Sequence, residues 1–334
     1  MMDRYSLYFT QPKTIEIKKE HIPAPQKNQV LVKTLYSSIS AGTEMLFYNN
    51  QLHEEVMVDD TIECLKHPFA YPLKYGYATV GKIASVGQNI PPEWDQKMVF
   101  AFHPHESYFL ASPNELIMIP ETITLIEATF LPSIETAVSL VMDGAPIIGE
   151  EVLIFGQGII GLLLTSVLSL FPVSTIITVE KQPLRRKKSR ELGAHESISS
   201  SKNPLDYFPN HVQADLLYEL TGNPDMLQEA IKYMKYTGRI IIGSWYGKKA
   251  SQVSLGTDFH RKRLQIMSSQ VSTIQPSYTG RWDKKRRIDV CWKLMKTIKL
   301  DSLVSHIIPF ENAQEAYHTI DTQPDKTLQV LLKY

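Results

Sequence analysis

A short apolar segment that ends in closely spaced glycines constrains the fold more than any other part of the sequence. Residues 152–161 read Val-Leu-Ile-Phe-Gly-Gln-Gly-Ile-Ile-Gly, which places glycines in the pattern G-x-G-x-x-G. The apolar run is typical of a buried parallel strand, and the apolar residues 162–170 predict a helix directly after the turn. Such glycines allow a tight turn, backbone approach to a pyrophosphate and close helix packing. We therefore predict a dinucleotide site, although a purely structural glycine turn is the alternative. Its binding residues are Gly156, Gly158, Ile159, Ile160 and Gly161.

An acidic residue follows at the distance that a dinucleotide site requires. The strand-like run 175–179 ends at Glu180, roughly 20 residues beyond the glycines. A carboxylate there accepts hydrogen bonds from ribose hydroxyls and repels a 2′-phosphate, which favours NAD as the cofactor. Lys181 and Arg185 come next and would instead bind that phosphate, so NADP remains possible.

Composition limits the class of protein. The chain has 334 residues, which suggests two domains, and its 35 basic and 35 acidic residues cancel. The chain therefore has no net charge that would attract it to nucleic acid or to a membrane surface, and we expect a small-molecule substrate. The two cysteines, Cys64 and Cys291, lie far apart in sequence, which argues against a structural zinc and for a reducing compartment. Neither a signal-peptide pattern nor an apolar run of about 18 residues is found, so we expect a cytoplasmic protein.

The pattern of predicted elements changes twice along the chain. Up to about residue 130, strand-like runs such as 30–36 and 79–86 alternate with turn signals, which predicts a barrel-like β-rich domain. From about residue 135 to 272, strand and helix patterns alternate, which predicts βαβ units and a parallel sheet. After residue 272 this alternation stops. The fold class is therefore α/β with a separate β-rich domain.

Several local motifs carry a resemblance to a known superfamily. Residues 40–44, Ser-Ala-Gly-Thr-Glu, resemble a catalytic loop that usually reads Cys-Gly-Thr/Ser-Asp/Glu. Residues 76–81, Gly-Tyr-Ala-Thr-Val-Gly, resemble Gly-His-Glu-x-x-Gly, and residues 192–194 read Leu-Gly-Ala. With these motifs the chain resembles the medium-chain dehydrogenase/reductase superfamily over nearly its whole length. Segments 39–44, 75–77, 100–105 and 280–283 are similar to the branch of bacteriochlorophyllide dehydrogenases within it.

The resemblance implies domain boundaries, a partner and further cofactor contacts. It implies a GroES-like β-barrel catalytic domain over residues 1–134, completed by 273–334. Residues 135–272 would form a Rossmann domain with a doubly wound parallel sheet, through which two copies form a homodimer. The cofactor site would gain four residues at or beyond later strand ends: Thr221, Gly243, Ser244 and Gln270.

The chain departs from zinc-type members of this superfamily. Ala41 stands where the resemblance places a zinc-binding cysteine, and Tyr77 and Ala78 replace the His-Glu pair of the second motif. An alanine offers no donor atom, and an isolated tyrosine is a poor zinc ligand. The run of four cysteines that holds a structural zinc is missing as well. We therefore predict no zinc at either family position.

Without zinc, protein groups must handle the proton or the developing oxyanion. The resemblance implies that Thr43 contacts the substrate oxygen, although a loop threonine before a helix is the alternative. Tyr77 would point into the cleft, where a hydrogen bond from its phenol to Glu44 would position it as an acid or oxyanion donor. The alternative is a core tyrosine that fills the metal space. His103 is a further candidate acid or base, and an ordinary surface histidine is the alternative.

The expected substrate pocket is partly apolar. Residues 45–60 and 103–109 would line it, and the expected substrate contacts are Phe102, His105, Arg281 and Trp282. An ion pair with a structural role is the alternative for Arg281. The predicted function is zinc-independent hydride transfer between nicotinamide and an alcohol or carbonyl of a medium-sized substrate. A reductase of activated C=C bonds and an inactive nucleotide-binding partner protein are the other hypotheses.

Overall fold

A computed structural model describes residues 2–334. The chain divides into two compact units. The first unit extends to Pro132 and includes Lys299–Tyr334, and the second is Ser133–Ile298. Within the described range, no helix is both long enough and apolar enough to cross a membrane.

The second unit contains a six-stranded parallel sheet. Its order is β11-β10-β9-β12-β13-β14, so the chain winds outward from β9 in both directions. Every residue of β9 and β10 is buried, as apolar central strands require. The predicted Rossmann fold is confirmed, and ligands bind such sheets at the carboxyl ends where the order reverses. The strands are β9 (Glu151–Phe155), β10 (Thr175–Val179), β11 (Glu196–Ile198), β12 (Ala214–Glu219), β13 (Met234–Ile242) and β14 (Gln265–Ser268).

The helices of this region follow the residue patterns. Helix α4 (Ile159–Leu168) is apolar and largely buried, whereas α5 (Pro183–Glu191) is charged and buries only Ser189. Gly193, with φ +105°, follows the end of α5 in the left-handed conformation that favours glycine. Asp283 caps α7 (Lys284–Met295) by accepting the N–H of Arg286 at 2.7 Å. The remaining helices are α3 (Leu131–Gly144) and α6 (Met226–Lys232).

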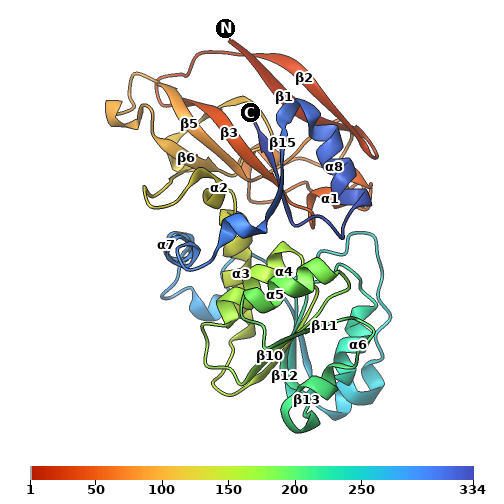
Figure 1. The fold of residues 1–334 in the computed structure, drawn as a ribbon. Helices are drawn as coiled ribbons and strands as arrows, with labels where there is room; N and C mark the ends of the chain where they lie inside the picture. The colour runs from red at the N-terminus through yellow and green to blue at the C-terminus, as the bar shows by residue number, and fades with distance from the viewer. Residues whose placement is uncertain (1) are drawn as a thin grey trace. The chain divides into compact units, whose positions relative to one another are not determined.

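The first unit is β-rich. A seven-stranded sheet has the order β15-β16-β3-β5-β6-β8, with β7 paired to β3, and a three-stranded antiparallel sheet has the order β2-β1-β4. Helix α8 lies beside β2 although the two are far apart in sequence (Figure 1). This architecture agrees with the predicted β-rich domain. The elements are β1 (Met2–Gln11), β2 (Thr14–Ile22), β3 (Val30–Ile39), α1 (Glu44–Tyr48), β4 (Leu73–Lys74), β5 (Thr79–Val86), β6 (Met98–Ala101), β7 (Tyr108–Ala111), β8 (Leu116–Met118), α2 (Leu125–Ala128), β15 (Val304–Pro309), α8 (Ala313–Thr322) and β16 (Gln329–Lys333).

Residues 273–298 group with the second unit, whereas the resemblance implies that they complete the first. A buried ion pair accounts for the difference. Arg287 lies 2.8 Å from the Glu135 carboxylate and also donates to the Val271 carbonyl at 2.5 Å. Tyr278 adds a bond from its hydroxyl to the Met142 carbonyl at 3.1 Å. These contacts hold the segment against α3, and the chain enters the first unit at Lys299.

Candidate functional site

The three glycines of the turn after β9 have three different environments. Gly156 has φ +89°, and a Cβ there would lie 2.6 Å from the Leu220 carbonyl oxygen. A Cβ on Gly161 would lie 2.1 Å from the Gly156 carbonyl oxygen. Gly158 instead faces open space, because nothing lies within 4 Å of its added Cβ. The first glycine therefore makes the turn, the third allows close packing, and the second leaves room for a ligand at the start of α4.

Glu180 lies directly beside this turn. It follows β10, and its side chain accepts the N–H of Gln157 at 2.7 Å and the N–H of Gln182 at 2.8 Å. Burial lowers the pKa of Arg185, and the charge of Glu180 opposes that shift. Arg186 donates to the main-chain carbonyls of Glu180 and Lys181, at 2.9 and 2.6 Å. The carboxylate is therefore held against the glycine turn, and Arg186 stabilises the loop that follows it.

Three of the other predicted cofactor residues lie at the carboxyl ends of β12 and β13. The Gly243 N–H donates to the Glu219 carbonyl at 3.0 Å, and the Ser244 hydroxyl accepts the Gly222 N–H at 2.9 Å. Thr221 donates both its N–H and its hydroxyl to the Glu219 carboxylate. Glu219 was not singled out by sequence reasoning, although an acid that ends an apolar strand is a recognisable signal. Gln270 is exposed, and its side chain accepts the Ser272 N–H at 3.1 Å.

In the first unit, three hydroxyl groups come together, and we call Ser40, Thr43 and Tyr77 the hydroxyl cluster. The Tyr77 phenol donates to Ser40 Oγ at 2.5 Å and also hydrogen-bonds with Thr43. Burial raises the pKa of Tyr77 to about 12, and the bonds to Ser40 and Thr43 only partly oppose that shift. The phenol is therefore protonated at neutral pH and acts as a donor. Sequence reasoning missed Ser40, which directly precedes Ala41.

The predicted hydrogen bond between Glu44 and Tyr77 is wrong. Glu44 is the first residue of α1, and its carboxylate turns back to accept the Ser40 N–H at 2.8 Å. The same carboxylate lies 3.0 Å from His105 Nε2 and accepts the Tyr317 hydroxyl. Its side chain is completely buried. Glu44 therefore supports the main chain under the hydroxyl cluster rather than the phenol itself.

The expectation that His105 contacts substrate also needs correction. Its side chain is completely buried, and both ring nitrogens are hydrogen-bonded. Nδ1 lies 2.7 Å from Ser37 Oγ, and Nε2 faces Glu44. The imidazole also packs on the Gly76 backbone, since a Cβ on Gly76 would lie 2.6 Å from the ring. The Ser37–His105–Glu44 arrangement resembles a hydrolytic triad in its order, but burial of all three residues excludes substrate.

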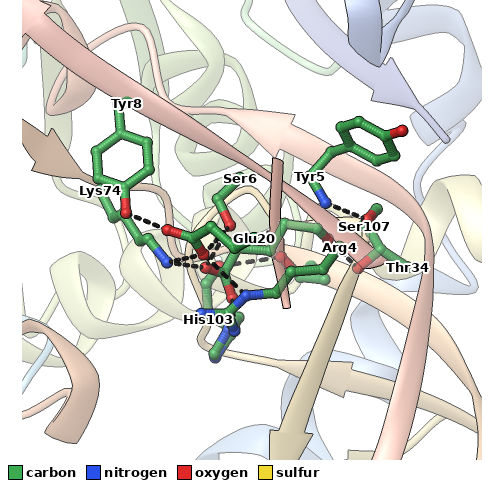
Figure 2. Close-up of polar contacts among 11 residues, drawn as sticks. Arg4, Tyr5, Ser6, Tyr8, Glu20, Thr34, Lys74, His103 and Ser107 are labelled. Carbon is green, nitrogen blue, oxygen red and sulfur yellow. Dashed lines mark hydrogen bonds and ion pairs between the residues drawn. The ribbon is translucent and has the colours of Figure 1, made fainter. Parts of the chain in front are cut away.

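His103 belongs to an ion network formed by Arg4, Glu20, Lys74, His103 and Glu106 (Figure 2). Its Nε2 lies 3.0 Å from the Glu106 carboxylate, and its ring stacks on Phe109 at 3.9 Å. Burial acts to raise the pKa of Glu106, but His103 and Lys74 outweigh it and hold that pKa at about 2. The network joins the 103–107 segment to β1, β2 and β4. The observed partner of the His103 ring is therefore Glu106, within the fold.

The predicted substrate residues are spread over both units. Phe102 is partly buried and packs edge to face on Phe100 at 5.1 Å. Arg281 and Trp282 precede α7 in the second unit. The Arg281 guanidinium lies over the Tyr278 ring at 5.5 Å, and Arg286 lies over the Trp282 ring at 4.2 Å. The contact observed for the Arg281 side chain is with the Tyr278 ring rather than an ion pair.

The residues at the family's metal position do not fit zinc. Ala41 and Ala78 carry no donor atom, and the Tyr77 phenol is hydrogen-bonded to Ser40. The neighbouring His105 has both nitrogens occupied, as described above. Across residues 2–334, no three His, Cys, Asp or Glu side chains are grouped so that they would hold a metal ion.

The fold and the glycine turn define the class: a β-rich unit and a unit with the Rossmann fold. Residues 160–284 match the family model described as zinc-binding dehydrogenase. The starvation-sensing protein RspB of Escherichia coli is 22% identical over 98% of this chain and 99% of its own. D-guloside 3-dehydrogenase of the same species is 24% identical over 76% of each chain.

Solved structures share the fold over the whole chain. RspB of Escherichia coli CFT073, complexed with NADH, has a TM-score of 0.80, 20% identity and 99% coverage of both chains. The 2R,3R-butanediol dehydrogenase of Bacillus subtilis has a TM-score of 0.81 at 18% identity, with 99% coverage of both chains. The chain is thus similar to zinc-binding dehydrogenases over residues 160–284, and the solved structures show an alcohol-dehydrogenase-like fold.

Proposed function

We propose that this chain is an NAD(P)-dependent oxidoreductase that works without zinc. It transfers a hydride between nicotinamide and an alcohol or carbonyl of a medium-sized, partly apolar substrate. The observation that carries the proposal is the hydroxyl cluster, in which Tyr77 donates to Ser40 beside two alanines that cannot bind a metal. Relatives that are named as dehydrogenases support the reaction class.

The second unit would hold the cofactor along the glycine turn. The first N–H groups of α4, at Ile159 and Ile160, have no partner within the helix and are therefore available to bind an anion. The open space over Gly158 lets a pyrophosphate approach them. Glu180 would bind the ribose hydroxyls, which favours NAD, while Lys181 and Arg185 keep NADP as the alternative. When bound, the nicotinamide donates or accepts the hydride.

The hydroxyl cluster would supply the proton chemistry. Because the pKa of Tyr77 is raised to about 12, its phenol stays protonated and can donate to a carbonyl oxygen that becomes negative during reduction. The alkoxide formed by hydride transfer would take its proton from Tyr77, and the hydroxyls of Ser40 and Thr43 would stabilise the phenolate until solvent returns a proton to it. Glu44 would keep the Ser40 main chain in place through its bond to the Ser40 N–H.

A second function is compatible with the same observation. Conjugate reduction of an activated C=C bond needs no Lewis acid at the carbonyl, and the donor set here does not fit zinc. The sequence motifs favour the first function, because they are similar to those of the bacteriochlorophyllide dehydrogenase branch.

We also propose a homodimer through the Rossmann unit and a cytoplasmic location, which follow from the resemblance and from composition.

A fluorescence titration with NADH and NADPH tests the proposal at its first step. We expect both to bind, with NADH binding more tightly because Glu180 repels a 2′-phosphate. A screen of aldehydes, ketones and enones with the preferred cofactor then separates the two reactions. Turnover of carbonyls supports the proposed function, and turnover of enones alone supports the second. Binding without any turnover would indicate an inactive partner protein, and no binding at all would refute the account.

A further inference from the structure

A buried carboxylate lies at the ligand-binding edge of the parallel sheet. Glu219 is the last residue of β12, and no part of its surface is exposed. One carboxylate oxygen accepts the N–H of Thr221 at 2.7 Å and the hydroxyl of the same residue. The other accepts the phenol of Tyr246 at 2.5 Å. Neutral donors on both oxygens stabilise a charge that burial would otherwise disfavour.

Tyr246 comes from the loop 243–249 that follows β13. Two more bonds join this loop to the one after β12. Ser244 accepts the Gly222 N–H at 2.9 Å, and Lys249 donates to the Gly222 carbonyl at 2.9 Å. Burial and the bond to Glu219 raise the pKa of Tyr246 far above its ordinary value, so its phenol is a donor at neutral pH.

The loop after β12 also touches the glycine turn. A Cβ on Gly156 would lie 2.6 Å from the Leu220 carbonyl oxygen, and a Cβ on Gly243 would lie 2.5 Å from Leu220 Cδ2. Leu220 therefore fills the space between the turn and the end of β13. Because interiors are closely packed, movement of the Tyr246 loop would displace Leu220 and with it the turn.

We propose that the hydrogen bond from Tyr246 to Glu219 holds the loops after β12 and β13 in the arrangement that receives the dinucleotide. This inference rests on the proposed function, because it assigns a role at the same cofactor site. Tyr246 and Glu219 are positioning residues that act through Leu220 and Thr221. Their loss weakens cofactor binding, while chemistry at the hydroxyl cluster in the first unit continues once cofactor is saturating.

The Tyr246→Phe variant removes only the hydroxyl and tests this inference. We expect its Kd for NADH, and its KM for NADH, to rise about tenfold, which is the scale of one hydrogen bond to a charged group. Its kcat at saturating NADH stays unchanged. Tyr236→Phe is the matched control, because this tyrosine lies on β13 with 72% of its surface exposed. Glu219→Gln is a second variant, which keeps an acceptor for Thr221 but loses the charge. We expect its Kd and KM for NADH to rise as well.

The outcomes separate this inference from the proposed function. If wild-type protein binds NADH and both Tyr246→Phe and Glu219→Gln bind it as tightly as Tyr236→Phe does, the positioning role is overturned and the proposed function stands. If the variants without cofactor have a lower Tm but an unchanged Kd for NADH, the hydrogen bond has only a structural role. This result also overturns the positioning role. If wild-type protein binds neither NADH nor NADPH, both are overturned.

Discussion

At the scale of single residues, Tyr77 is the hydrogen-bond donor that we propose in place of a zinc ligand. Its phenol stands in a cluster with Ser40 and Thr43, and burial raises its pKa to about 12. A phenol in that state donates a hydrogen bond but does not accept a proton. Tyr77 therefore suits stabilisation of an oxyanion and not the work of a base near neutral pH.

Replacing Tyr77 with Phe tests that role. We expect kcat to fall by about 10²-fold, because one preorganised donor to the oxyanion is lost. Tyr75→Phe is the matched control, since its ring packs edge to face on Tyr77 at 6.1 Å within the same loop. In wild-type protein, steady-state rates measured from pH 6 to 10 should show no fall caused by Tyr77, since the phenol ionises only near its raised pKa of about 12. A kcat equal to that of the Tyr75→Phe control would remove Tyr77 from the mechanism.

The hydrogen bonds around Glu44 mark the limit of prediction at this scale. The motif 40–44 indicates a catalytic loop, but it cannot say toward which partner a carboxylate turns. His105 and Tyr317 reach Glu44 from positions 61 and 273 residues away in sequence. Only the folded chain brings them together, which is why we predicted a bond to Tyr77 in place of these contacts.

At the scale of elements, the strand–turn–helix unit of β9 and α4 was readable from sequence alone. Its information is local: an apolar strand, glycines at fixed spacing and an apolar helix. Each glycine has the environment that its place in the pattern predicts, with Gly158 alone of the three open to a ligand. Contacts among loops from different strands, such as Tyr246 with Glu219, have no local signal and were missed.

A pair of glycine substitutions separates folding from binding in this unit. Gly158→Ala adds a methyl group to open space, so we expect an unchanged Tm but a Kd for NADH raised on the order of tenfold or more. In Gly156→Ala the new methyl group would collide with the Leu220 carbonyl, and the residue would be strained at φ +89°. We expect this variant to lose about 2 kcal/mol of stability or more. Thermal unfolding and NADH titration of both variants provide the check. Normal NADH affinity in Gly158→Ala would contradict a pyrophosphate at this turn.

At the scale of the whole molecule, the alternation of strands and helices predicted the Rossmann unit, and the turn-rich N-terminal region predicted the β-rich unit. The point where the chain enters the first unit again was harder to place. Arg287 and Glu135 are 152 residues apart in sequence, and their buried ion pair keeps α7 with the second unit. A basic helix looks solvated from its residues alone, so the pairing of one arginine could not be foreseen.

We propose that hydride transfer by this chain needs no zinc. Deuterium transfer tests it most directly, with NADH deuterated at the transferred position, a carbonyl substrate found by the screen, and protein treated with a chelator. Zinc content is measured on the same sample by mass spectrometry. We predict that deuterium appears in the alcohol product at the rate of untreated protein, with zinc far below one ion per chain. Transfer that appears only after zinc is added, with one ion bound per chain, would contradict it.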